Sequence, residues 1–290
     1  MLVKSYAKIN WTLDVLFKRE DGYHEIRTIY QTVSLHDRLR LSETAGALEI
    51  SCDDERVPIG ETNLAHKAAR LLRDAAGVKA GARIEIEKRI PVAAGLGGGS
   101  SNAAATLLGL ARLWRVELTE REMFDLAASL GSDVPFFLIG GTALGVGRGE
   151  EVYPIEEAGA EDLLLVNPGF GVETATAYGR LSRLTMKESA RIIPFTLFAA
   201  KAICELPFAA SNDLEETVSA AHPEIAEVKR ELLSMGARRA LMSGSGATVL
   251  GVFDNSETSG QAQSSMRAAG YWSARASAIN RQQYWNTIFD

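Results

Sequence analysis

The chain has 290 residues, a length that favours two domains, and 46% of its residues are hydrophobic, which is enough material for a core. Its formal net charge of −6 argues against a nucleic-acid-binding protein, whose surface would carry an excess of Lys and Arg. Cys52 and Cys204 lack the spacing of metal ligands, and no apolar run is long enough for a signal peptide or a membrane span. These features predict a cytoplasmic enzyme that binds anionic ligands through locally placed donors.

The N-terminal part of the chain is predicted to form a largely antiparallel β-sheet. Apolar and polar side chains alternate over residues 4–16, which predicts a strand with Lys8 and Asn10 on its polar face. A lysine at such a position either lies on a solvated face or points as a cation across a cleft toward a phosphate, and the pattern does not choose between these. Further short strands are predicted over residues 26–35, 38–43 and 48–51.

A tight turn is predicted at Asp21-Gly22, and Tyr23 and His24 follow it directly. An aromatic ring beside a histidine at the rim of a loop can stack on a planar ligand. The alternative is that Tyr23 packs on the sheet and His24 lies at the surface.

A glycine-rich stretch lies between a strand predicted over residues 83–90 and a helix predicted over residues 103–114. Four glycines fall within five positions, and Ser100 and Ser101 follow where a helix would be capped. Free backbone N–H groups and the helix dipole favour an anion at such a junction. We interpret the stretch as a phosphate-binding loop, and the alternative is a merely flexible connection.

Two familiar nucleotide-binding motifs do not fit this loop. A Walker A loop ends in Gly-Lys-Ser/Thr, whereas Gly99 is followed by Ser100. The dinucleotide fingerprint G-x-G-x-x-G fails at its last position, where Ser100 stands. A dinucleotide-dependent oxidoreductase is therefore excluded.

The remaining N-terminal elements are a helix over residues 62–76, capped by Thr62 or Asn63, and a helix over residues 120–130. Asp133 follows, two residues before Pro135 at a predicted helix start. Asp133 could simply cap that helix. Because an apolar segment lies directly behind it, we favour a catalytic or metal-binding carboxylate. A glycine-interrupted strand is predicted over residues 140–149.

An acidic stretch over residues 150–160 suggests a domain boundary, which divides the chain into residues 1–155 and 156–290. The second part has the order of a ferredoxin-like, split βαβ domain. Its turn at residues 243–246 is either a tight hairpin or a second backbone wall facing the phosphate loop. No element is predicted over residues 185–207. The predicted strands cover residues 163–166, 240–242, 248–253 and 271–279, and the helices cover residues 173–181, 223–235 and 256–269, with another begun by residues 211–215.

These motifs together resemble the GHMP kinase superfamily over nearly the whole chain. The resemblance lies in three stretches, which are Ala7-Lys8-Ile9-Asn10 with Asp21-Gly22-Tyr23-His24, residues 91–101, and residues 242–248. The Asp-Gly-Tyr-His element is similar to that of the members that act on a cytidine diphosphate-linked alcohol. One departure is Asn102, where family members often carry Asp, and it leaves an additional acidic group near the metal in doubt.

The resemblance implies an α+β fold of two domains, one like ribosomal protein S5 domain 2 at the N-terminus and one ferredoxin-like at the C-terminus. It also implies a kinase that uses ATP and Mg²⁺ to phosphorylate the 2-hydroxyl of a cytidine diphosphate-linked tetrol in the non-mevalonate route to isoprenoids. The partner would be this small molecule, with no nucleic acid or membrane, and the enzyme would be a monomer or homodimer.

The resemblance also implies residue roles. Asp133 would receive or orient the substrate hydroxyl proton, and Lys8 would stabilise the moving phosphoryl group and keep Asp133 ionised. Tyr23 and Tyr178 would sandwich the cytosine base, His24 would read its edge, and Asn10 would make a polar contact. Asn63 would lie near adenine, and Ser101 or a neighbour would help to bind Mg²⁺. ATP would be held by Pro91, Val92, Ala93, Ala94, Gly95, Leu96, Gly97, Gly98, Gly99, Ser100 and Ser101.

Two alternatives keep the same fold. A homoserine, mevalonate or phosphomevalonate kinase would not need the element at residues 21–24 together with Tyr178. A non-catalytic nucleotide sensor would need to keep neither Lys8 nor Asp133.

Overall fold

The computed structural model describes residues 1–159, 162–181 and 210–289, and residues 185–207 and Cys204 therefore lie outside it. Its first layer is a sheet with the strand order β3-β4-β2-β1-β8, onto which β5 and β6 are joined through β2. The strands are β1 (Leu2–Lys18), β2 (His24–Thr44), β3 (Leu48–Cys52), β4 (Gly81–Glu87), β5 (Thr142–Gly147), β6 (Glu151–Pro154) and β8 (Ser211–Asn212).

Residues 26–35 and 38–43 form the single strand β2, so the prediction of two separate strands was wrong. The interruption in the pattern comes from a register shift, because Tyr6 pairs with His36 whereas Ala7 pairs with Val33. Such a bulge keeps the strand continuous while changing which side chains face each side.

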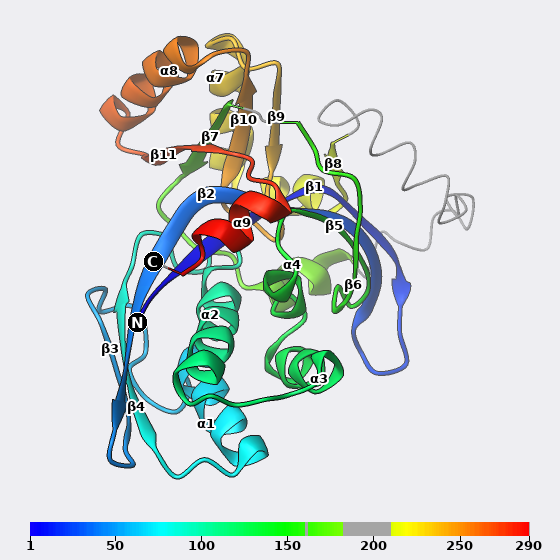
Figure 1. The fold of residues 1–290 in the computed structure, drawn as a ribbon. Coiled ribbons are helices and arrows are strands. Elements are labelled where there is room, and N and C mark those ends of the chain that lie inside the picture. The colour runs from blue at the N-terminus through cyan, green and yellow to red at the C-terminus, as the bar shows by residue number, and fades with distance from the viewer. Residues whose placement is uncertain (160–161, 182–209, 290) are drawn as a thin grey trace.

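Helices α1 (Leu64–Ala76), α2 (Gly98–Leu113) and α3 (Glu120–Leu130) group on one side of the long strands β1 and β2, as Figure 1 shows. Asn63 caps α1, and its side-chain oxygen accepts a hydrogen bond from the backbone N–H of Ala65. Helix α2 begins at Gly98 rather than at Ala103, so the glycine loop runs directly into its first turn.

The second sheet is entirely antiparallel and has the order β11-β7-β10-β9, which is the ferredoxin-like arrangement and confirms the predicted fold class. Figure 1 shows it on the opposite side of β1 and β2 from α1 and α2. Its strands are β7 (Asp162–Asn167), β9 (Arg239–Met242), β10 (Val249–Phe253) and β11 (Trp272–Ser277), and its helices are α4 (Thr174–Leu181), α6 (Leu214–Ala221), α7 (Pro223–Ser234) and α8 (Ser256–Ala268).

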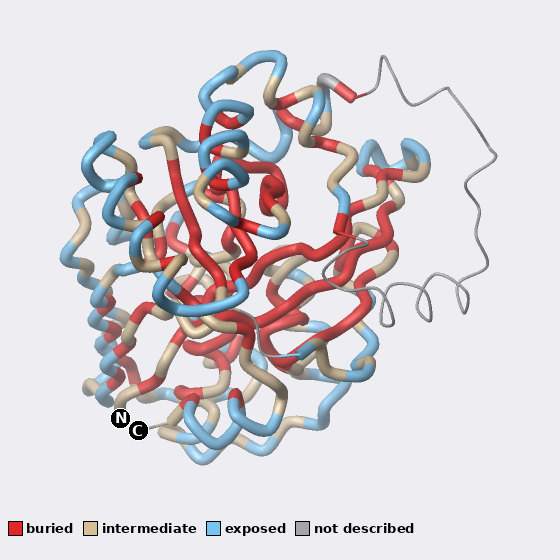
Figure 2. Tube along the Cα trace, turned by 90° about the horizontal axis from the view of Figure 1, so that it is seen from above, coloured by how far each residue is buried: buried red, intermediate tan, exposed pale blue. Residues whose placement is uncertain are grey.

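The two sheets share a core, and the chain passes between them more than once. Ile9 and Trp11 of β1 pack in one buried cluster with Leu163 and Leu250 of the second sheet, in the buried centre seen in Figure 2. Helix α9 (Arg281–Thr287), which the sequence pattern did not predict, returns to the first sheet.

The division into residues 1–155 and 156–290 stays a prediction, and β8 and α9 of the second range lie against the first sheet. Within the described residues, no helix has both the length and the apolar character needed to span a bilayer.

Candidate active site

Lys8 and Asp133 meet where the two layers join. Lys8 is only 4% exposed, and its Nζ lies 3.2 Å from Asp133 Oδ2, whereas Asp133 remains 30% exposed. The glycine loop and the turn at residues 243–246 cover the polar face of β1 at Lys8, so Lys8 points into the structure rather than to solvent. A buried ammonium requires partners, and Lys8 also donates a 2.7 Å hydrogen bond to Asn10 Oδ1. The pair places a cation and an accessible carboxylate in one site.

Asn10 lies buried beside Lys8 and is oriented by the sheet. Its Nδ2 donates a 2.7 Å hydrogen bond to Thr28 Oγ1, and that hydroxyl donates to the backbone carbonyl of Thr12. The amide oxygen of Asn10 is thereby directed at Lys8, so the ammonium has a second partner besides Asp133.

The glycine loop wraps around Lys8. Gly95 and Gly97 have φ of +75° and +68°, in the left-handed region that glycine adopts without strain. The backbone N–H of Lys8 donates to Leu96 O at 3.0 Å, and a Cβ at Gly97 would lie 3.0 Å from Lys8 Cγ. Gly97 precedes α2 without a side-chain cap, so the first N–H groups of α2 have no capping side chain. This donor set fits the phosphates of a nucleotide.

The turn at residues 243–246, which belongs to the second layer, packs against the glycine loop. Ser243 Oγ donates to Gly95 O at 3.1 Å, and the N–H of Thr248 donates to Ala94 O at 3.3 Å. A Cβ at Gly244 would lie 3.4 Å from Lys8 Nζ. The turn at residues 243–246 thus faces the glycine loop and approaches the ammonium of Lys8 through backbone without a side chain, in agreement with the second of the two interpretations of its sequence.

Beneath the loop lies a buried polar cluster that the sequence analysis did not identify. The carboxylate of Asp37, which has no exposed surface, accepts hydrogen bonds from Lys88 Nζ at 2.5 Å and from the backbone N–H groups of Arg89 and Ile90. Asn102 Nδ2 donates to the same carboxylate at 2.9 Å. The signal that could have revealed this cluster is the alternation of β2, which places Asp37 between Leu35 and Leu39 on the same face of the strand.

Ser101 belongs to this cluster more than to the loop surface. It is 1% exposed, and its Oγ accepts a 2.7 Å hydrogen bond from Ser5 Oγ. The neighbouring Ser100 is half-buried and lies nearer to solvent. Within the described residues no group of three or more His, Cys, Asp or Glu side chains could hold a metal ion. A Mg²⁺ ion would therefore be bound mainly through phosphate oxygens and water, as Mg²⁺ commonly is.

The structure differs from the prediction in which ring lies against Tyr178. The ring of Tyr178 stacks on His24, with ring centroids 5.3 Å apart and planes 29° apart. Tyr23 is 55% exposed, and its ring lies against the guanidinium of Arg148 instead of facing Tyr178. The structure thus brings His24 and Tyr178 together and leaves Tyr23 beside them.

Burial lowers the pKa of His24, and the charge of Lys18 lowers it further. The imidazole is therefore neutral at neutral pH, and its Nε2 is buried without a hydrogen-bond partner among the described residues. Burial also raises the pKa of Tyr178, and the charge of Asp133 adds to this shift. Both rings are thus uncharged at neutral pH.

Asn63 lies at the start of α1 and is 7% exposed. Its Oδ1 accepts from the N–H of Ala65, and its Nδ2 donates to Pro58 O at 2.7 Å. The side chain thus has a structural role as a helix cap, and its predicted place near adenine stays a prediction.

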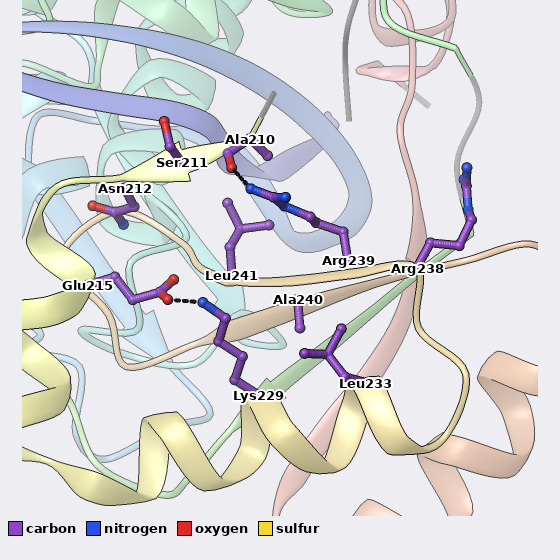
Figure 3. A pocket seen from close by; sticks show the side chains of 10 residues that line it. All are labelled: Ala210, Ser211, Asn212, Glu215, Lys229, Leu233, Arg238, Arg239, Ala240 and Leu241. Carbon is purple, nitrogen blue, oxygen red and sulfur yellow. Dashed lines mark hydrogen bonds and ion pairs between the residues drawn. The ribbon is translucent and has the colours of Figure 1, made fainter. Parts of the chain in front are cut away.

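A separate hollow of about 420 Å³ lies between α7, β8 and β9 (Figure 3). Its cations are already paired, because Lys229 contacts Glu215 and Arg239 donates to Ala210 O. Asn212, which lines this hollow, donates to Met242 O and Gly244 O, both at 2.8 Å. Its side chain therefore helps to hold the turn at residues 243–246 in place. Lys8, Asp133 and the glycine loop do not line it.

Two family models match parts of the chain. Residues 63–141 match the family model for the GHMP kinases N terminal domain, and residues 199–271 match the model for GHMP kinases C terminal. A 4-diphosphocytidyl-2-C-methyl-D-erythritol kinase of Bacillus cereus (strain AH187) is 46% identical over 256 residues, which cover 87% of this chain and 88% of its own. A protein of the same name from Bacillus anthracis (strain CDC 684 / NRRL 3495) gives the same values.

Solved structures agree in fold. The crystal structure of a 4-(cytidine 5'-diphospho)-2C-methyl-D-erythritol kinase matches with a TM-score of 0.81 and 36% identity, over 97% of this chain and 100% of that chain. The mevalonate kinase of Methanococcus jannaschii matches with a TM-score of 0.71 but only 15% identity, over 97% of this chain and 98% of that chain. The second similarity concerns the fold alone.

Proposed function

The chain belongs to the 4-diphosphocytidyl-2-C-methyl-D-erythritol kinases of the GHMP kinase family, and on this premise we propose that its site transfers the γ-phosphoryl group of ATP to the 2-hydroxyl of that cytidine compound. The observation that carries the proposal is the contact of Lys8 with Asp133, 3.2 Å between Nζ and Oδ2, directly beside the glycine loop. A cation and a carboxylate are thereby placed where a phosphate and an alcohol would meet.

Phosphoryl transfer passes through a loose transition state, so positioning and charge stabilisation account for most of the catalysis. The alcohol oxygen forms a bond to the γ-phosphorus while the bond from this phosphorus to the bridging oxygen of ADP breaks. Asp133 accepts or orients the proton of the alcohol, and Lys8 stabilises the negative charge on the moving group. Lys8 cannot turn to solvent because Asn10 and Asp133 hold its ammonium from two sides.

The backbone N–H groups of the loop and of the first turn of α2 would hold the ATP phosphates, within residues 91–101. Mg²⁺, when bound, would neutralise charge on the phosphates. Its protein ligand would be the hydroxyl of Ser101 or of a neighbour, and Ser100 is the hydroxyl nearer to solvent. Asn63 would border the adenine.

The cytidine end of the substrate would bind at His24 and Tyr178, with Asn10 as a polar contact and Tyr23 at the rim. The neutral imidazole of His24 could form a hydrogen bond to the edge of the base through Nε2, once the ring moves to expose this buried nitrogen. For the base to lie between Tyr23 and Tyr178, the ring of Tyr23 would have to leave Arg148. We also infer a cytoplasmic enzyme, monomeric or homodimeric, that acts in the non-mevalonate isoprenoid route.

A coupled assay of ADP release with ATP and Mg²⁺ tests this function. It compares the cytidine diphosphate methylerythritol substrate with mevalonate and homoserine. We expect turnover with the cytidine compound alone, and a loss of at least about 100-fold in Asp133→Asn, which is typical for a lost proton-transfer or electrostatic group. Turnover only with another alcohol would contradict the assigned substrate, and ATP binding without any turnover would favour a sensor.

A further inference from the structure

The buried Tyr30 of β2 contacts Asp133, and neither the motifs nor the proposed roles account for its hydroxyl. Tyr30 Oη donates a hydrogen bond to Asp133 Oδ1 at 3.0 Å, and the carbonyl of Gly149 is a longer alternative acceptor at 3.4 Å. Lys8 Nζ lies 3.2 Å from the other carboxylate oxygen, Oδ2. The two oxygens of Asp133 are therefore not equivalent, because each has its own partner.

The surroundings of the Tyr30 ring leave its hydroxyl little freedom. The residue is 1% exposed, and its ring packs against Phe136 with centroids 4.9 Å apart. A Cβ at Gly145 would lie 2.4 Å from Tyr30 Cε2, and a Cβ at Gly149 would lie 2.4 Å from Tyr30 Oη. Two glycines thus provide the space that the ring and its hydroxyl fill. A group enclosed in this way holds its partner in one orientation.

Tyr30 is a neutral donor at neutral pH. Burial raises its pKa well above 10, and the charge of Asp133 adds to this shift. The other titratable groups that face Tyr30 and Asp133 are Lys8 from β1, Tyr178 from α4 and Glu150. None of these groups supplies a second neutral donor to Oδ1.

We propose that Tyr30 is a positioning residue for Asp133, whose Oδ1 it holds in a hydrogen bond so that Oδ2, the oxygen facing Lys8, meets the substrate hydroxyl. Tyr30 touches neither substrate nor phosphate in this role and acts only through the carboxylate. The inference rests on the proposed function, because it specifies which oxygen of Asp133 takes part.

The test compares Tyr30→Phe with Tyr6→Phe. Both substitutions remove one hydroxyl from a buried ring, and Tyr6 Oη forms a 2.7 Å hydrogen bond with Thr287 Oγ1, away from the site. We expect kcat of Tyr30→Phe to fall about 10- to 100-fold, as when other groups that orient a functional residue are lost. We expect both KM values to change by less than about threefold, because ground-state contacts remain. Tyr6→Phe should keep the wild-type kcat.

The pH profile separates a positioning role from a structural one. A donor to a carboxylate favours its ionised form, so the acid limb of the kcat profile should move to higher pH in Tyr30→Phe and not in Tyr6→Phe. The protonation of ATP and of the substrate affects the wild type, Tyr30→Phe and Tyr6→Phe equally, so it does not contribute to a difference between their pH profiles. A wild-type kcat and acid limb in Tyr30→Phe, or a loss matched by Tyr6→Phe, would overturn the positioning role alone. Absence of turnover in the wild-type chain would overturn the proposed function and this inference with it.

Discussion

The side-chain amide of Asn102 donates a hydrogen bond to the carboxylate of Asp37 at 2.9 Å, and both residues are almost completely buried. The same Nδ2 donates to Ser5 Oγ at 2.8 Å, and Asp37 in turn holds Lys88 and the backbone just before the glycine loop. An aspartate at position 102 would place a second carboxylate against the first. Asp37 therefore favours an amide at position 102, because the amide donates a hydrogen bond where an ionised aspartate would repel the carboxylate.

We expect Asn102→Asp to destabilise the fold by about 2–4 kcal/mol, because it brings a second buried charge next to Asp37 with Lys88 as the neighbouring cation. The loss should be larger at pH 8 than at pH 5, since a proton bound by the pair removes the repulsion. Urea unfolding at both pH values measures it. Asn255→Asp is the matched control, because Asn255 is an exposed cap of α8 where aspartate serves equally well. Equal stability of the two variants would contradict this reading of the cluster.

Gly95→Ala tests the contact between the glycine loop and the turn at residues 243–246. The added Cβ would lie 2.1 Å from Ser243 O, and the φ of +75° disfavours any side chain. We expect the KM for ATP to rise at least about tenfold, because backbone strain of roughly 1–3 kcal/mol must be relieved by moving the loop. Gly46→Ala, at an exposed turn where the nearest atom lies 4.0 Å away, should behave as wild type. An unchanged KM for ATP in Gly95→Ala would show that the contact is dispensable.

Tyr178→Ala tests the base pocket. The substitution removes the ring that stacks on His24, and base stacking on an aromatic side chain contributes roughly 1–3 kcal/mol. We therefore expect the KM for the cytidine substrate to rise about 5- to 150-fold while the KM for ATP stays constant. Tyr153→Ala, at a 47% exposed tyrosine of β6, controls for the loss of a tyrosine as such. If both KM values of Tyr178→Ala stayed at wild type, the base would have to bind elsewhere.

The pH dependence of substrate binding reports on His24. Burial, and then the charge of Lys18, lower the pKa of His24 below its ordinary 6.5, so the folded protein binds this proton less tightly than the unfolded chain does. The KM for the cytidine substrate should therefore stay constant as the pH falls to about 6.5 and should rise only at lower pH. By linkage, the same shift lowers the stability of the fold below that pH. His24→Gln should abolish the rise in KM, and a rise that persists in this variant would come from another group.

Much of the secondary structure and the outline of the site followed from the sequence, because both are encoded locally. The alternation over residues 4–16, the start of α1 at Asn63 and the glycine loop before α2 are short-range patterns of apolar period, capping and turn chemistry. The order and spacing of three motifs indicated the family and its substrate class. None of these signals depends on which segments meet in space.

The tertiary structure decided what each polar residue contacts, because a contact between distant segments leaves no period in the sequence. It turned Lys8 inward by covering the polar face of β1, and it stacked His24 rather than Tyr23 on Tyr178. It also returned α9 to the first sheet. Asp37 and Tyr30 looked like ordinary residues of a strand, yet one supports the phosphate loop and the other contacts Asp133. Burial makes these contacts matter, since a buried polar group without a partner is costly and most such groups therefore have one.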